Sequence, residues 1–200
     1  MKKIQVQGAH HITLVGSTRQ VAIDFWEGVL GMPFIFEQPN LGKPDENHLY
    51  FDPGDGRLLT VFTNESLQPA RRHAPREVGC VEHIAFNVSR ATFTHAPARL
   101  RERGIEFIER DRGFMNSIYL RDPNGLKVEL ACYKFETPEG FRPADVLLLV
   151  DAARLWKAQS EGLFEPIRSA TLESRIPQSL RATATEGGTA WFGISTRARV

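Results

Sequence analysis

Polar and apolar residues alternate in several short stretches of this chain, and two longer stretches have helical spacing instead. Alternation is clear in His11-Ile12-Thr13-Leu14 and in His83-Ile84-Ala85-Phe86. Residues with a period of two predict strands that have one apolar face. A stretch with apolar residues three and four apart follows each strand, at residues 17–30 and residues 90–103. Each opening therefore predicts a strand followed by a helix.

The predicted helices carry start and stop signals. Ser17 and Gln20 have the spacing of a capping box, in which both side chains satisfy amide donors at the helix start. Gly31 and Gly104 suit the left-handed residue that ends a helix. Pro97 lies inside the second stretch, and an interior proline predicts a kink or a later start.

The strand and helix belong to a repeated plan. After Gly31 and after Gly104 come further alternating stretches, and the last two in each copy flank an Asp-Pro turn, at Asp52-Pro53 and at Asp122-Pro123. Each copy thus predicts a βαβββ module with a final hairpin. One such module would bury little apolar surface by itself, so the two are expected to pair.

The repeat sets the expected domain organisation. Module one occupies residues 8–64 and module two residues 80–134, within one domain of residues 1–134. Residues 64–79 are rich in Pro, Arg and Glu and read as the linker between modules. We expect an α+β fold in which two paired βαβββ modules form a curved mixed sheet around a metal cavity. Residues 135–200 are expected to form a C-terminal helical extension and a tail.

Composition excludes several classes of partner. The 200 residues are 42% hydrophobic and 24% charged, with a formal net charge of +1. These are ordinary values for a globular protein, and no basic cluster predicts nucleic-acid binding. Two cysteines, no apolar leader and no run of about 18 apolar residues predict a cytoplasmic protein without a membrane span.

Strand alternation puts potential metal ligands on the faces of the strands that carry polar side chains. In module two, His83 shares the polar-bearing face of its strand, and Glu129 shares that face of the last strand. In module one, the same test puts His11 on the polar-bearing face. His10, its neighbour, is expected to point the opposite way. Two imidazoles and a carboxylate form a facial triad that leaves coordination positions open on a divalent ion, so we expect a metal site.

Three further residues are expected to face the same cavity and to serve in proton transfer. Tyr119 is the first candidate, followed by His48 and Tyr50, because apolar Leu49 and Ile118 occupy the opposite faces of those strands. Cys80 and Cys132 lie an odd number of residues from His83 and Glu129. Alternation therefore turns them away from the cavity, and they are not expected to act as nucleophiles.

The sequence resembles the vicinal oxygen chelate superfamily over residues 8–134. The resemblance is carried by the two His-Ile openings and by Tyr119-Leu120-Arg121-Asp122-Pro123-Asn124-Gly125-Leu126-Lys127-Val128-Glu129, which is similar to the end of the extradiol dioxygenase signature. The superfamily includes glyoxalase I, type I extradiol dioxygenases, fosfomycin-resistance thiol transferases and bleomycin-resistance proteins. The resemblance implies metal ligands at His11, His83 and Glu129, and a homodimer.

The sequence departs from the family pattern at two places. Thr60 stands where Glu129 stands in the other module, so the fourth protein ligand expected of glyoxalase I is missing. The histidine that extradiol dioxygenases carry upstream of the signature is replaced by Arg110-Asp111-Arg112.

Several functions stay open at this point. The first is an extradiol-type dioxygenase that acts on a small bidentate substrate, with Fe(II) as its metal and Mn(II), Zn(II) or Ni(II) as alternatives. The second is a glyoxalase-like lyase or isomerase, or a thiol transferase. The third is a small-molecule binding protein of the resistance type, which would have no need of the metal.

Overall fold

The computed structural model describes residues 3–70 and 73–134 of the chain. Contacts divide the chain into two compact units, Met1–Cys132 and Tyr133–Val200, and the fold below is that of the first. The expected C-terminal helical extension, residues 135–200, lies outside the described residues. No helix in the described part of the chain is long and apolar enough to cross a membrane.

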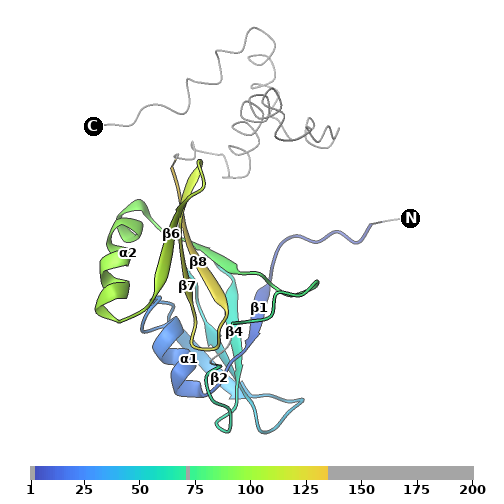
Figure 1. Cartoon of the computed structure of the whole chain (residues 1–200). Coiled ribbons are helices and arrows are strands. Elements are labelled where there is room, and N and C mark those ends of the chain that lie inside the picture. The colour runs from blue at the N-terminus through green and yellow to red at the C-terminus, as the bar shows by residue number, and fades with distance from the viewer. Residues whose placement is uncertain (1–2, 71–72, 135–200) are drawn as a thin grey trace. The chain divides into compact units, whose positions relative to one another are not determined.

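The first unit consists of two βαβββ modules, as the repeat predicted (Figure 1). Module one comprises β1 (His11–Val15), α1 (Arg19–Trp26), β2 (Phe34–Pro39), β3 (Asn47–Phe51) and β4 (Leu58–Thr63). Module two comprises β5 (Ile84–Asn87), α2 (Arg90–Glu102), β6 (Phe107–Asp111), β7 (Met115–Arg121) and β8 (Lys127–Tyr133).

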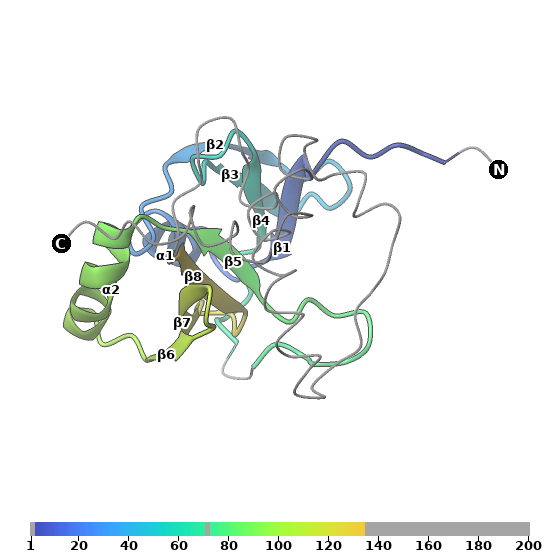
Figure 2. The same cartoon turned by 90° about the horizontal axis from the view of Figure 1, so that it is seen from above.

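Each module forms its own four-stranded mixed sheet, with the same strand order in both. The first sheet, called sheet A, has the order β1-β4-β3-β2, and the second, called sheet B, has the order β5-β8-β7-β6. The first strand of each module lies parallel to the last one, with Thr13 beside Thr60 in sheet A and Ala85 beside Glu129 in sheet B. The two sheets are separate in the view of Figure 2, so the mixed sheet is divided between the modules.

Helix α2 ends just before Gly104, as predicted, whereas α1 ends earlier than predicted. Gly31 and Gly104 both have left-handed φ angles, 69° and 66°, which suit a residue that ends a helix. Helix α1 nevertheless ends at Trp26, with Glu27 as its C-cap, well before Gly31. The start of α1 also differs from the prediction. The cap of α1 is Thr18, which accepts a hydrogen bond from the Val21 amide, and not Ser17. The Ser17 backbone therefore lies one residue outside the position from which a side chain reaches the first free amides.

Pro97 does not delay or end α2, contrary to the prediction. The helix starts after its cap Ser89 and continues through Pro97 to Glu102. Ala96 and Leu100 on either side of the proline are buried. Packing of this face against the core offsets the hydrogen bond that the proline removes.

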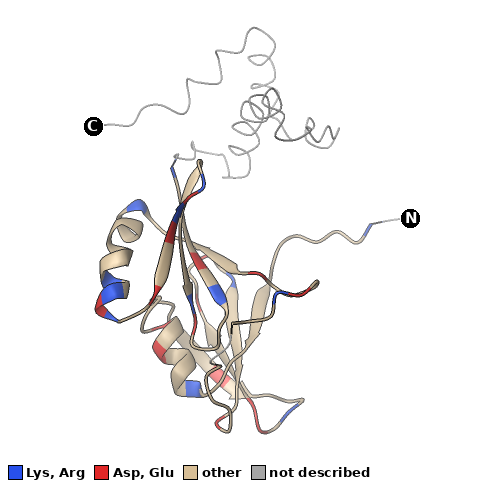
Figure 3. Ribbon diagram, viewed as in Figure 1, with Lys and Arg blue, Asp and Glu red and all other residues tan. Residues whose placement is uncertain are grey.

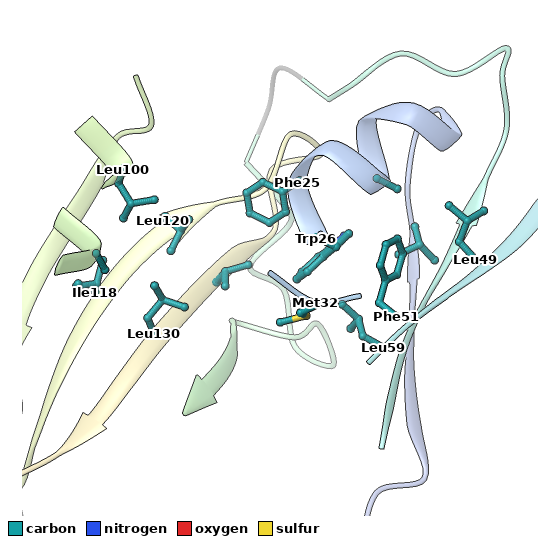
Figure 4. Packing of buried hydrophobic residues seen from close by; sticks show 14 residues of the cluster. Phe25, Trp26, Met32, Leu49, Phe51, Leu59, Leu100, Ile118, Leu120 and Leu130 are labelled. Atoms are coloured by element: carbon teal, nitrogen blue, oxygen red, sulfur yellow. The ribbon is translucent and has the colours of Figure 1, made fainter. Parts of the chain in front are cut away.

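One hydrophobic core spans both modules (Figure 4). Helix α1 contributes Phe25 and Trp26, which point into the space between the two sheets in Figure 4. Trp26 is 1% exposed, and its ring meets Phe86 of β5 edge-on with centroids 6.1 Å apart. Buried apolar surface is the main favourable term in folding, so this helix joins the modules into one domain.

Acidic and basic side chains are interspersed over the described elements (Figure 3). This distribution agrees with the small net charge of the chain. Cys80 is exposed and Cys132 is buried, and they are not joined by a disulfide.

Candidate functional site

A buried carboxylate on sheet B contacts a histidine from the neighbouring strand. Glu129 lies in β8 and is only 2% exposed, whereas His83 immediately precedes β5. Their atoms Nε2 and Oε2 are 2.9 Å apart. A buried charge needs partners, and His83, at the entrance to the strand that pairs with β8, provides this one. The predicted pairing of His83 with Glu129 is therefore present in the structure.

The second carboxylate oxygen of Glu129 has a different partner. Ser117 of β7 is fully buried, and its hydroxyl donates to Oε1 of Glu129 across 2.5 Å. An O–H donor to an ionised carboxylate forms one of the shorter and stronger hydrogen bonds in proteins. Oε1 of this carboxylate therefore contacts a serine hydroxyl, whereas Oε2 contacts a histidine ring.

Tyr119 lies beside the His83–Glu129 pair, and its hydroxyl accepts a hydrogen bond from an arginine. Its ring meets His83 edge-on with centroids 5.7 Å apart. Arg112 donates from Nη2 to the Tyr119 hydroxyl across 3.2 Å, and its guanidinium also stands over the ring, 5.5 Å from the centroid. The bond to Tyr119 raises the pKa of Arg112, and the charge of Glu129 adds to this effect.

Because Tyr119 accepts the arginine hydrogen bond, its own hydroxyl hydrogen is left to donate elsewhere. This makes Tyr119 the best-placed proton or hydrogen-bond donor on sheet B. Arg112 and Ser117 were not assigned roles by the sequence. Ser117 could have been found by its position two residues before Tyr119, which puts it on the face that Glu129 occupies.

His11 does not join His83 and Glu129 within one chain. In the described residues, no group of three or more His, Cys, Asp or Glu side chains is arranged to hold a metal ion. His11 instead contacts His10, with the two Nδ1 atoms 2.8 Å apart. The prediction that His10 points away was wrong, because β1 begins only at His11 and alternation does not extend to the residue before it.

The absence of a three-ligand group among the described residues of one chain has a simple reason. Alternation assigns a residue to a face of its own sheet, and His11 belongs to sheet A while His83 and Glu129 belong to sheet B. Nothing in the alternation of single strands fixes how two sheets face each other.

His48 and Tyr50 form a separate polar group on sheet A. Gln38 donates to the Tyr50 hydroxyl across 3.0 Å, and that hydroxyl lies 2.9 Å from Nδ1 of His48. Burial lowers the pKa of His48, and the charge of His11 lowers it further. Nε2 of His48 is buried without a hydrogen-bond partner among the described residues. His48 and Tyr50 share one face of sheet A, as predicted, whereas Glu129 belongs to sheet B.

A cleft of about 1230 Å³ lies between α1, the end of α2 and strands β6 and β7. Tyr119 is part of its wall, and Asp122 lies at its turn end. Burial raises the pKa of Asp122, while its hydrogen bonds to the turn amides act in the opposite direction. His83 and Glu129 do not line this cleft, and Tyr119 is the candidate site residue that does.

Comparison with known proteins gives two groups of relatives. Glutathione transferase FosA of Serratia marcescens is 28% identical over 125 residues, which is 62% of this chain and 80% of the relative. A crystal structure described as a "putative dioxygenase" from Bacillus subtilis is 27% identical with a TM-score of 0.55, over 62% of this chain and 40% of that one.

The second group is shorter and more similar. Iron uptake protein A1 of Synechocystis is 52% identical over 58 residues, which is 29% of this chain and 15% of the relative. The chain therefore spans 15% of that protein and 40% of the Bacillus protein.

The model of one protein family matches residues 8–130, which include both modules, the His83–Glu129 pair and Ser117. This chain belongs to the Glyoxalase/Bleomycin resistance protein/Dioxygenase superfamily.

Proposed function

We propose that this protein is a divalent-metal-dependent enzyme with His83 and Glu129 as two of its metal ligands. The observation that supports this most directly is the contact of 2.9 Å between Nε2 and Oε2, two atoms of the kinds that bind divalent metals. Atoms that bind one ion at about 2.1 Å each, at a right angle, are separated by about 3 Å. The donor set and its spacing therefore fit such an ion.

The third ligand proposed is His11 of a second copy of the chain, in a homodimer. Sheet A leaves apolar side chains exposed on both of its edge strands, with Val15 of β1 76% exposed and Phe36 of β2 47% exposed. Strand β1 is also an edge of its sheet. Exposed apolar patches of this kind mark interfaces between proteins. A twofold pairing would bring sheet A of one copy to sheet B of the other at two equivalent places.

Complementation tests this arrangement. We expect His11→Ala and Glu129→Gln to bind no Mn(II) separately, and a mixture refolded together to regain about a quarter of the sites. Half of randomly mixed dimers contain both variants, and one of their two sites has all three ligands. No regain after mixing, while each variant separately stays folded and dimeric, would contradict a site shared between copies.

The reaction proposed first is an extradiol-type dioxygenation of a small bidentate substrate. Fe(II), when bound, would supply a Lewis acid and a site for oxygen. On the protein side, Tyr119 would donate its hydroxyl hydrogen to a substrate oxygen, and Arg112 would keep that hydroxyl oriented. The 27% identity to the Bacillus dioxygenase structure supports this class.

A glutathione transfer is the second candidate, because FosA matches over 80% of its own length. A lyase or isomerase reaction and metal-free binding of a small molecule are weaker alternatives. Assays of the full chain separate them. Oxygen uptake with a catechol panel after anaerobic Fe(II) loading would support dioxygenation. Consumption of glutathione in the presence of fosfomycin and Mn(II) would support transfer. Conversion of a glutathione hemithioacetal without either would support the lyase.

A separate placement is proposed for the part of the chain that is similar to iron uptake protein A1. The superfamily model covers residues 8–130, and residues 135–200 are long enough to hold a match of 58 residues. We propose that the match lies there. Comparison of residues 1–134 and residues 135–200 separately with that protein tests the placement. A match retained by residues 1–134 would overturn it.

A further inference from the structure

Glu129 is held from two sides in the structure, and the role of one of its partners is not explained by metal binding alone. His83 contacts Oε2 at 2.9 Å, and Ser117 donates to Oε1 at 2.5 Å. An ionised carboxylate can only accept hydrogen bonds, so the hydrogen in the second contact belongs to Ser117. Oε1 is therefore occupied by a hydroxyl, and Oε2 is the oxygen that lies with the imidazole nitrogen.

Without such a partner the carboxylate of a glutamate is free to turn. The terminal torsion of a glutamate side chain is broad and has no sharp rotamers, so either oxygen, or both together, could be presented to an ion. Ser117 is suited to prevent this, because it is 0% exposed in the middle of β7 and has little room to move.

The other module supports a linked role for the serine and the glutamate. Thr60 stands in place of Glu129, and its hydroxyl donates to Thr13 across 2.9 Å. At the position two residues before the tyrosine, where module two has Ser117, module one has His48, whose ring contacts Tyr50. Sheet A thus lacks both the carboxylate and the serine that would orient it.

We propose that Ser117 is a positioning residue, which orients the Glu129 carboxylate so that Oε2 alone, together with His83 Nε2, is presented to a divalent ion. This inference rests on the proposed metal site. It concerns a residue that need not contact the ion or the substrate. Partners of this kind typically change metal affinity by about 10- to 100-fold when they are removed.

Mn(II) titration of the full chain, followed by electron paramagnetic resonance of the unbound ion, measures the effect. We expect Ser117→Ala to weaken Mn(II) binding by about tenfold or more, and Ser117→Thr, which keeps the hydroxyl, to restore most of it. Ser17→Ala is the matched control. Ser17 is equally buried, but its hydroxyl has no hydrogen-bond partner among the described residues, so this variant should bind like the wild type.

A spectroscopic measurement separates orientation from a general loss of structure. In infrared difference spectra of the Mn(II)-bound and metal-free chain, the two carboxylate stretching bands lie far apart for a one-oxygen ligand and close together for a two-oxygen ligand. We expect wide splitting in the wild type and narrow splitting in Ser117→Ala. Metal-free circular dichroism spectra establish that the variant is folded. If Ser117→Ala does not fold, the same spectra of Ser117→Thr must show the wild-type splitting, and any other splitting would overturn the proposal.

The outcomes distinguish the positioning role from the metal site itself. If the wild type binds no Mn(II), or if Glu129→Gln binds it as well as the wild type, the proposed metal site fails. If Glu129→Gln loses binding while Ser117→Ala retains wild-type affinity and wide splitting, only the positioning role of Ser117 is overturned.

Discussion

The two sheets share one strand order but carry different chemistry at matched positions. Sheet B has the Glu129 carboxylate at the centre of β8, with partners on both oxygens. Sheet A has Thr60 at the equivalent position, where one hydroxyl contact to Thr13 satisfies it. Both side chains are buried, at 2% and 0% exposure. The difference shows that one backbone plan accepts a buried charge only where neighbouring strands supply its partners.

The comparison extends to the tyrosines next to these positions. Tyr119 accepts a hydrogen bond from Arg112, whereas Tyr50 accepts one from Gln38 and contacts His48. The same residue type therefore contacts an arginine and the ring of His83 in sheet B, and a histidine whose pKa is lowered by burial in sheet A. We propose that sheet B supplies two of the metal ligands, and that sheet A of a second copy supplies the third, His11.

The largest expected effect comes from neutralising the carboxylate of sheet B. Glu129→Gln should weaken divalent-metal binding by more than about 100-fold and abolish turnover, because an amide is a poor ligand and Ser117 and His83 lose their charged partner. Metal analysis and activity assays measure this. Thr60→Val, the matched change in sheet A, should leave metal content unchanged. Equal metal content in Glu129→Gln and the wild type would remove Glu129 from the site.

A smaller effect is expected when the side chain of α1 that contacts both modules is removed from the core. Trp26→Ala should lower the free energy of unfolding by about 3–5 kcal/mol, because it leaves a cavity where α1 meets both sheets. Chemical denaturation measures the change. Phe36→Ala removes an aromatic ring that is 47% exposed and should cost about 1 kcal/mol or less. Similar losses in the two variants would show that α1 does not join the modules.

The smallest effect concerns the pH dependence of His48 on sheet A. Burial lowers its folded-state pKa from the ordinary value of 6.5, so the unfolded chain binds more protons as the pH falls below that value. The stability associated with neutral His48 is therefore present above about pH 6.5 and is lost as the pH falls toward the folded-state pKa. Denaturation of the wild type and of His48→Gln at several pH values should show a shallower acid loss in the variant. Identical pH profiles would contradict the burial of this ring.

Much of the fold could be predicted from the sequence because local patterns determine it. The repeat, the βαβββ order, the stop of α2 at Gly104 and the apolar faces of the strands depend on alternation and on backbone preferences. The start of α1 was misplaced by one residue and its end by several, and α2 continues through Pro97. In α2, the burial of Ala96 and Leu100 outweighs the local preference of the proline.

The candidate site was predictable only in part. The parallel pairing of β5 with β8 puts His83, the residue just before β5, near Glu129. The hydroxyl of Ser117 on Oε1 and the guanidinium of Arg112 on Tyr119 depend on side-chain directions across strands, which a single sequence does not encode. The placement of His11 depends on how two separate sheets face each other.

The sequence by itself determined which residues share a face of each sheet, since that depends on the period of two along a strand. Only the tertiary structure decided that Glu129 is buried with a different partner on each oxygen, and that His11 stays apart from it within one chain. The physical reason is that the burial of a charge and the meeting of two sheets are set by packing between distant segments, and each strand taken alone is compatible with several such arrangements.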